Sequence, residues 1–184
     1  GSTIYCEGNI SNHIFYILKG EVKTFKTNQE GKELITEIYF SKSFFGFTSL
    51  LENKPYTENA KNIKDTSLIR IQKHELFELI KTNPKLGLNF MDLLSADLEY
   101  VKHHLLHLVY DPVRSKTADA ILYLYGKVGL KKTVDISRSD LASYLGIAKE
   151  TLTRTLTDFK EEKLIETFKN EIQILDPEGL QKIR

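Results

Sequence analysis

The chain of 184 residues has a single cysteine, Cys6, and this scarcity excludes an internal disulfide framework. One thiol also cannot hold a metal cluster or a zinc site that needs several thiolates of one chain. No apolar run approaches the roughly 20 residues of a membrane span, and the start of the chain lacks the pattern of a signal peptide. We therefore expect a soluble protein in a reducing compartment, the cytoplasm.

An excess of one charge sign is also missing. Lys plus Arg number 26 and Asp plus Glu number 25, which gives a formal charge of +1. Composition alone therefore does not indicate a nucleic-acid partner, and evidence for one must come from local residues. The 41% of hydrophobic and 28% of charged residues are ordinary for a globular chain with a core.

The first part of the chain is typical of short strands separated by turns. Residues 13–18 are rich in β-branched and aromatic side chains, and residues 21–26 alternate polar with apolar ones. Residues 34–40 alternate again after a polar loop, and residues 67–71 close the series. Strands at such close spacing favour a small antiparallel roll or barrel over a parallel sheet.

Proline is scarce, with four residues, and none lies between Lys85 and Tyr110, where the sequence predicts one long helix. Apolar residues recur in it at steps of three and four, which is the heptad pattern of a coiled coil. The residues of this seam after Gly87 are Met91, Leu94, Leu98, Val101, Leu105 and Leu108. A second apolar stripe, suited to packing on the roll, consists of Leu86, Phe90 and Leu93. The pattern predicts a homodimer; the alternative is one amphipathic helix lying on its own domain.

Asp111 and Pro112 interrupt the helical pattern. Pro112 disfavours helical geometry at Asp111 and suits the first position of a new helix, which the Asp111 side chain could cap. We therefore predict a hinge at these two residues. Residues 1–110, including the helix 85–110, are expected to form one domain and residues 111–184 a second.

Residues 133–175 carry the most informative pattern. A serine cap at Ser137, with an acid three residues later, opens a short helix that ends at Gly146. A second helix follows over about residues 148–163, so the pair predicts a helix-turn-helix. Residues 164–175 then predict a hairpin, the wing.

The second of these helices has two faces. At 100° per residue its core-forming side chains are Leu152, Leu156 and Phe159. About opposite lie Glu150, Thr153, Arg154 and Thr157, with Lys149 at the flank. Arg can bind guanine through two hydrogen bonds and Glu can accept one from the cytosine amino group, so this face suits a major groove. The alternative is a helix pair with a polar outer face that binds nothing.

These pieces together resemble the Crp/Fnr family of bacterial transcription regulators over nearly the whole chain. The most specific stretch is residues 136–154, and residues 18–22, 31–33 and 45–46 support it. The resemblance implies an α+β protein with an antiparallel β-roll (a double-stranded β-helix) of the cyclic-nucleotide-binding type. A long dimerisation helix and a C-terminal winged helix-turn-helix would follow. The roll begins late by comparison with the family, which leaves open a further N-terminal segment.

The resemblance also implies residue roles. The residues that it assigns to base contacts are Lys149, Glu150, Thr153 and Arg154. Lys149 stands where many members have an Arg, and Thr153 where Fnr-like members have a Ser. Ser137 and Arg138 would hold phosphates, which positions the protein without specifying a sequence.

The effector pocket departs from the family. Members that bind cyclic nucleotides have a Glu for the ribose and an Arg for the cyclic phosphate. Phe47 replaces that Glu, Tyr56 or Thr57 falls at the Arg position, and no arginine precedes Arg70. A buried phosphate charge without a partner costs several kcal/mol. We therefore expect a degenerate pocket at Phe47, Tyr56 and Thr57 that does not bind cAMP, and the effector stays unknown.

Catalytic residues, cofactors and metal ligands are not expected. His103 and His107 have a spacing that could ligate a metal or make a dimer interface sensitive to pH, but solvated histidines beside the seam are the favoured interpretation. A cupin-like enzyme would need several strand histidines, whereas the roll offers only His13. The expected partners are double-stranded DNA and a second copy of the chain, with RNA polymerase as a further candidate and no membrane. The alternative is a ligand-sensing module that acts through a protein partner.

Overall fold

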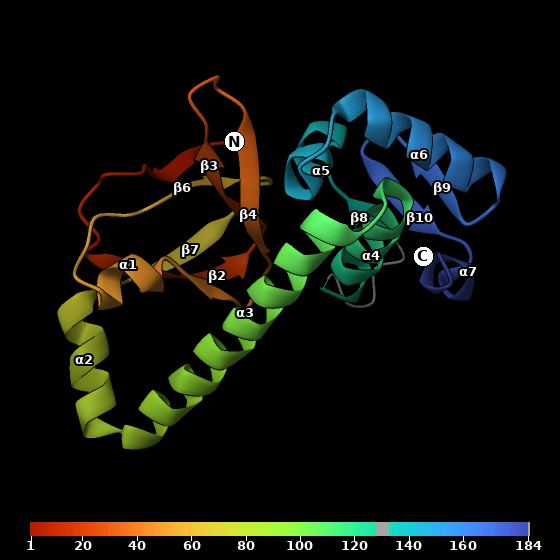
Figure 1. Cartoon of the computed structure of the whole chain (residues 1–184). Coiled ribbons are helices and arrows are strands. Elements are labelled where there is room, and N and C mark those ends of the chain that lie inside the picture. The colour runs from red at the N-terminus through yellow and green to blue at the C-terminus, as the bar shows by residue number, and fades with distance from the viewer. Residues whose placement is uncertain (128–132, 184) are drawn as a thin grey trace. The chain divides into compact units, whose positions relative to one another are not determined.

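Two units make up the computed structural model, which describes residues 1–127 and 133–183. The first unit contains residues 1–26 and 36–104, and the second contains residues 27–35 and those from 105 onward. The predicted α+β class is confirmed, with antiparallel sheets, a long helix and a C-terminal helix-turn-helix (Figure 1).

The first unit is a roll of two antiparallel sheets. Its strands are β1 (Thr3–Tyr5), β2 (His13–Lys19), β3 (Val22–Thr27), β4 (Glu33–Tyr39), β5 (Phe44–Phe45), β6 (Asn59–Asn62) and β7 (Ser67–Gln72). One sheet has the order β1-β6-β3-β4 and the other β5-β2-β7. Buried side chains from both sheets form one cluster: Tyr5, Phe15, Ile17, Val22, Phe45, Tyr56 and Ala60. The roll core therefore lies between the sheets and is largely aromatic.

Three helices complete this unit, namely α1 (Phe47–Leu51), α2 (Lys73–Thr82) and α3 (Pro84–Tyr110), which continues into the second unit. The predicted second stripe of α3 packs on the roll, since Phe90 and Leu93 lie partly buried against a cluster that contains Phe47 and Leu76. Leu94, which was predicted for the seam, is also partly buried in this contact. Within the described residues, no helix has the combined length and apolar composition of a membrane span.

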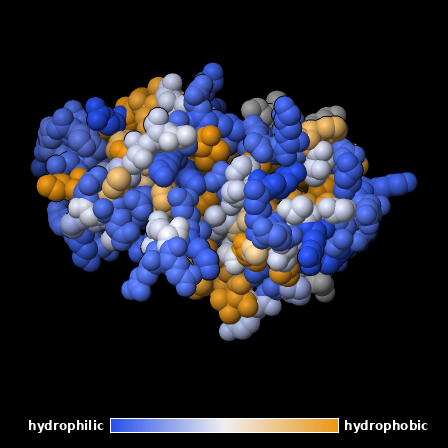
Figure 2. All heavy atoms as spheres, turned by 90° about the horizontal axis from the view of Figure 1, so that it is seen from above, coloured by the Kyte–Doolittle hydropathy of each residue, from blue (hydrophilic) through white to orange (hydrophobic). Residues whose placement is uncertain are grey.

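The second unit contains the helix-turn-helix. Its elements are α4 (Val113–Lys127), β8 (Thr133–Asp135), α5 (Arg138–Leu145), α6 (Lys149–Glu161), β9 (Ile165–Phe168), β10 (Glu171–Ile174) and α7 (Pro177–Gln181). The strands form one sheet of order β8-β10-β9. Its core contains fully buried Ile121, Leu141, Leu152 and Phe159 from α4, α5 and α6. The surface in Figure 2, in contrast, is mostly hydrophilic, and hydrophobic residues appear there as separate patches.

Candidate nucleic-acid interface

A tight turn joins α5 to α6. The Oγ atom of Ser137 accepts a hydrogen bond from the backbone N–H of Asp140 at 3.0 Å and so caps α5. Gly146 ends α5 with φ at 62°, in the left-handed region that glycine enters without steric cost. Ala148 stands at the N-cap of α6, where its methyl group cannot accept a hydrogen bond. The predicted serine cap and glycine turn are confirmed.

α6 presents a buried face and an exposed face. Leu152 and Phe159 are completely buried, and Leu156 and Thr155 are nearly so. The four residues predicted for base contacts are all exposed: Lys149, Glu150, Thr153 and Arg154. They occupy the first two turns of the helix, and their side chains are therefore accessible without any rearrangement of the core.

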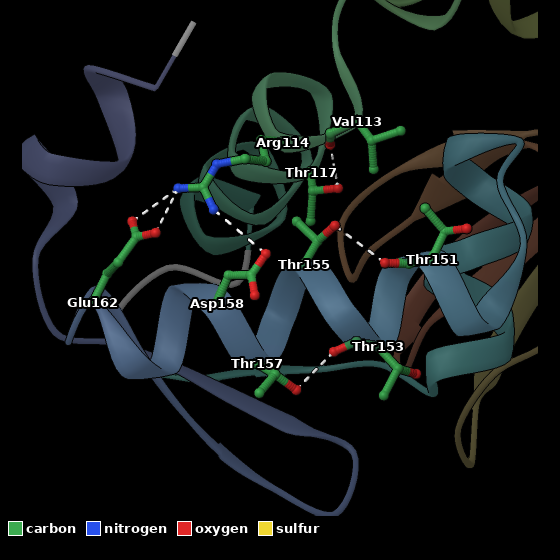
Figure 3. Close-up of polar contacts among 9 residues, drawn as sticks. All are labelled: Val113, Arg114, Thr117, Thr151, Thr153, Thr155, Thr157, Asp158 and Glu162. Atoms are coloured by element: carbon green, nitrogen blue, oxygen red, sulfur yellow. Dashed lines mark hydrogen bonds and ion pairs between the residues drawn. The ribbon is translucent and has the colours of Figure 1, made fainter.

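Threonines recur at every second position of α6, and Figure 3 shows how they divide. Thr155 points toward α4, whereas Thr153 and Thr157 point away from it (Figure 3). The Thr153 hydroxyl donates to the carbonyl of Lys149 at 2.8 Å, and the Thr157 hydroxyl donates to the carbonyl of Thr153 at 2.9 Å. These local bonds use the hydroxyl protons inside the helix. The outer face therefore offers oxygen lone pairs and methyl groups.

Arg114 of α4 holds the C-terminal half of α6 (Figure 3). Its Nη2 atom donates to both carboxylate oxygens of Glu162 at 2.8 Å, and Nη1 lies 3.6 Å from Oδ2 of Asp158. The guanidinium carbon lies 5.0 Å from the ring centre of Phe159, a cation–π distance. The sequence showed no pattern that pairs Arg114 with these residues, because they are more than 40 positions away along the chain.

The two residues predicted for phosphate contacts differ in their present bonding. The Ser137 hydroxyl lies 2.7 Å from Oδ2 of Asp140, so its proton is engaged in the helix cap. Arg138 is half-buried, and its buried Nη1 atom has no hydrogen-bond partner among the described residues. Burial lowers the pKa of this guanidinium. A buried donor without a partner costs free energy, which an anionic oxygen placed there would recover.

The wing follows as a hairpin. β9 and β10 pair in antiparallel register from Phe168 opposite Glu171 to Ile165 opposite Ile174. Lys169 at the turn has φ at 51°. Phe168 and Lys169 are exposed at the tip. The hairpin therefore carries an aromatic and a basic side chain outward.

The predicted seam residues lie on α3 with different exposure. Those that are at least half exposed are Met91, Leu98, Val101 and Leu105. Leu94 and Leu108 are intermediate, and none of the described residues of α3 is buried. The exposed apolar surface also extends to Leu106 and Val109, outside the predicted heptad positions. One chain alone thus leaves an apolar helix face in contact with water.

The break between α3 and α4 falls at Asp111 and Pro112, since α3 ends at Tyr110 and α4 begins at Val113. The predicted cap is wrong in detail. The Pro112 carbonyl accepts the first bond of α4 from the backbone N–H of Lys116, so Pro112 precedes the helix instead of opening it. The Asp111 carboxylate contacts Nδ1 of His107 at 2.5 Å. The Asp111 carboxylate therefore contacts the His107 imidazole of the preceding turn instead of capping α4.

The three residues of the predicted effector pocket lie in different surroundings. Phe47 is buried and meets the ring of Phe90 edge-on, with ring centres 5.6 Å apart. Tyr56 is buried, stacks on Tyr5 with ring centres 3.8 Å apart, and donates to a backbone carbonyl at 2.8 Å. Thr57 is exposed. Two of the three predicted pocket residues, Phe47 and Tyr56, are thus packed in the core, whereas Thr57 is not.

Comparison with protein families matches the two parts of the chain separately. Residues 1–83 match the cyclic nucleotide-binding domain, and residues 103–183 match the Crp-like helix-turn-helix domain. Together the matches include the roll and both helices of the helix-turn-helix.

Similar proteins are transcription regulators. The CRP-like cAMP-activated global transcriptional regulator of Mycobacterium tuberculosis is 24% identical over 188 residues, covering 99% of this chain and 84% of that protein. The transcriptional activator protein FnrA of Stutzerimonas stutzeri is 25% identical over 186 residues, covering 98% and 76%. The structure of FixK2 from Bradyrhizobium japonicum aligns with a TM-score of 0.90 at 19% identity, covering 97% of this chain and 90% of that one.

Proposed function

Because the chain belongs to the Crp/Fnr family of transcriptional regulators, with a helix-turn-helix DNA-binding domain, we propose that it binds an inverted-repeat DNA site as a homodimer. The two α6 helices would enter successive major grooves about 34 Å apart. A cytoplasmic location and a contact with RNA polymerase are part of the same proposal.

The exposed first two turns of α6 carry this proposal. Glu150 and Arg154 are one turn apart and both exposed, so both side chains can reach base edges from the same face. Arg154 is assigned to guanine O6 and N7, and Glu150 to a cytosine amino group. Lys149 beside them supplies a compact ammonium charge where the planar fork of an arginine could bind a base through two parallel hydrogen bonds.

Arg138 supports a phosphate contact near the start of α5. Its orphaned Nη1 donor gains a partner when a phosphate oxygen approaches. Ser137 can add a hydroxyl contact only by exchanging its bond to Asp140. We therefore assign the larger share of phosphate binding to Arg138.

The apolar face of α3 supports the homodimer. Leu98, Val101 and Leu105 are each about half exposed and follow the heptad steps. Contact with the same face of a second chain would remove these side chains from water. Each Å² of apolar surface buried in this way would stabilise the dimer by roughly 25 cal/mol. A ligand that acts on the roll would then alter the register of two DNA-binding domains through the Asp111–Pro112 hinge.

Absence of a cAMP response is also proposed. Phe47, at the family's Glu position, and Tyr56, one of the two residues that fall at its Arg position, are buried in apolar packing, whereas the other candidate, Thr57, is exposed. None of these three side chains carries a positive charge that could neutralise a phosphate.

Selection of bound sites from random duplex DNA at stated salt tests the proposal. We expect an enriched inverted repeat, and a gel shift in which the retained complex contains two chains. Arg154→Ala should cost roughly 1–3 kcal/mol and relax specificity at one base pair of each half-site. Failure to enrich any repeat, or unchanged selectivity in the variant, would overturn the assignment.

Arg138→Ala is the matched comparison, because it removes an arginine of the same domain. This change should weaken binding to all DNA sequences by the same factor and reduce the salt dependence of binding. If Arg138→Ala instead changed the preferred base at one position, its phosphate role would be wrong.

A further inference from the structure

Three possible metal ligands converge where α3 meets α4. His107 lies in the last turn of α3, Asp111 in the connection, and Asp119 in the second turn of α4. The Nδ1 atom of His107 lies 2.5 Å from Oδ2 of Asp111 and 3.7 Å from Oδ2 of Asp119. One ligand atom from each residue lies within 4.8 Å of the other two.

The break at Pro112 brings these residues together. His107 and Asp111 are one helical turn apart, which the end of α3 places on the same side. The new direction of α4 (Figure 1) then lets Asp119 approach from a second helix. The sequence indicated only the pair His103 and His107. His103 is not part of this cluster of described residues.

One imidazole nitrogen and two carboxylate oxygens are a usual ligand set for divalent transition metals. We propose that His107, Asp111 and Asp119 bind one divalent transition-metal ion of the Zn²⁺ class. Donors about 2.1 Å from a tetrahedral ion are about 3.4 Å apart, so the His107–Asp119 distance already nearly fits. The His107–Asp111 hydrogen bond would open by about 1 Å as the ion replaces the shared proton.

The cluster places two carboxylates beside one imidazole, and carboxylate oxygens are anionic ligands that attract a divalent cation. The exposed fractions of the side chains are 42% for His107, 28% for Asp111 and 45% for Asp119. An ion could therefore enter from solvent and keep water in its remaining positions.

A bound ion would join the end of α3 to α4 across the break. If the connection acts as the hinge of the proposed function, the ion would restrict the rearrangement that links the roll to α6. This effect on DNA depends on the proposed function, whereas metal binding itself does not.

Titration of the untagged full chain with Co²⁺ and with Zn²⁺ tests the site. The background should carry Cys6→Ser, because Cys6 is an exposed thiol that could bind either ion by itself. We expect one ion per chain, with a Co²⁺ absorption spectrum of nitrogen and oxygen ligation. Asp119→Asn, which keeps the size of the side chain, should weaken binding by at least about tenfold, and His107→Ala by a similar factor or more.

His103→Ala is the matched control, since it removes an exposed histidine one turn earlier on α3. It should leave the affinity unchanged. Equal losses for His103→Ala and His107→Ala, or no stoichiometric binding in the folded chain, would overturn the proposal. Circular dichroism of each variant shows whether it is folded. Because these titrations contain no DNA, their failure would leave the proposed DNA binding unaffected.

Discussion

Replacing Arg114 with alanine should release the C-terminal half of α6 from α4. The change removes two contacts of 2.8 Å with the Glu162 carboxylate, one of 3.6 Å with Asp158, and the stacking on Phe159. It also leaves the carboxylates of Asp158 and of Glu162, the residue that caps the C-terminus of α6, without the positive charge between them.

The expected loss of stability is about 1–2.5 kcal/mol. Arg114 is 39% exposed, so the ion pairs are discounted to about 0.2–1 kcal/mol together. An exposed cation–π contact adds about 0.5–1 kcal/mol. Repulsion between the two remaining carboxylates adds about 0.2–0.5 kcal/mol. For a chain of this length the sum lowers the midpoint of thermal unfolding by about 2–10 °C.

Thermal and urea unfolding of Arg114→Ala, Glu162→Ala and the double variant measure the coupling between the two side chains. We expect a coupling energy of at least about 0.5 kcal/mol. Arg114→Lys should recover only part of the loss, because an ammonium cannot reach both acids and the ring in one geometry. A change below about 0.3 kcal/mol in Arg114→Ala, or additive single changes, would refute the reasoning.

Three further predictions concern the first unit and α3. Leu98→Glu should make the chain monomeric in ultracentrifugation, whereas Leu98→Met should keep the homodimer proposed above. Dimers of Leu98→Glu would argue against the seam. Burial raises the pKa of Glu58, so the folded state loses stability as pH rises through that raised pKa. Glu58→Gln should therefore raise the unfolding temperature more at pH 8 than at pH 4. Glu30→Gln, a change in an exposed loop, should not produce this difference between the two pH values. Calorimetry with cAMP should detect no micromolar binding, and a clear isotherm would contradict the assignment of Phe47 and Tyr56.

Strong periodicity made most of the fold predictable. The long helix was expected over residues 85–110 and extends over 84–110, because no proline or capping residue interrupts it. The strand expected over residues 13–18 is β2, at His13–Lys19. In contrast, β6 has the sequence Asn-Ala-Lys-Asn, which has low strand propensity. It forms a strand because β1 and β3 pair with it on both sides, information that its own residues do not contain.

The positions of individual side chains were predictable only where one element determined them. The exposed face of α6 follows from its helical period, so the exposure of Glu150 and Arg154 was predictable from the sequence. Arg114 and Asp119 make their contacts with residues of other elements, and the local spacing of residues does not indicate these contacts. Asp111 had a local preference for capping, but a neighbouring imidazole offered its carboxylate a stronger partner.

If α6 enters the major groove as proposed, the hydrogen bonds that Thr153 and Thr157 make inside the helix affect what kind of base these side chains can recognise. With its proton already given to a carbonyl, each hydroxyl can only accept, and each of these side chains also carries a methyl group. Such a surface distinguishes thymine from uracil through the C5-methyl group. Replacing single thymines of a bound site with deoxyuridine would therefore weaken the complex at positions beneath these threonines, although every Watson–Crick pair stays the same.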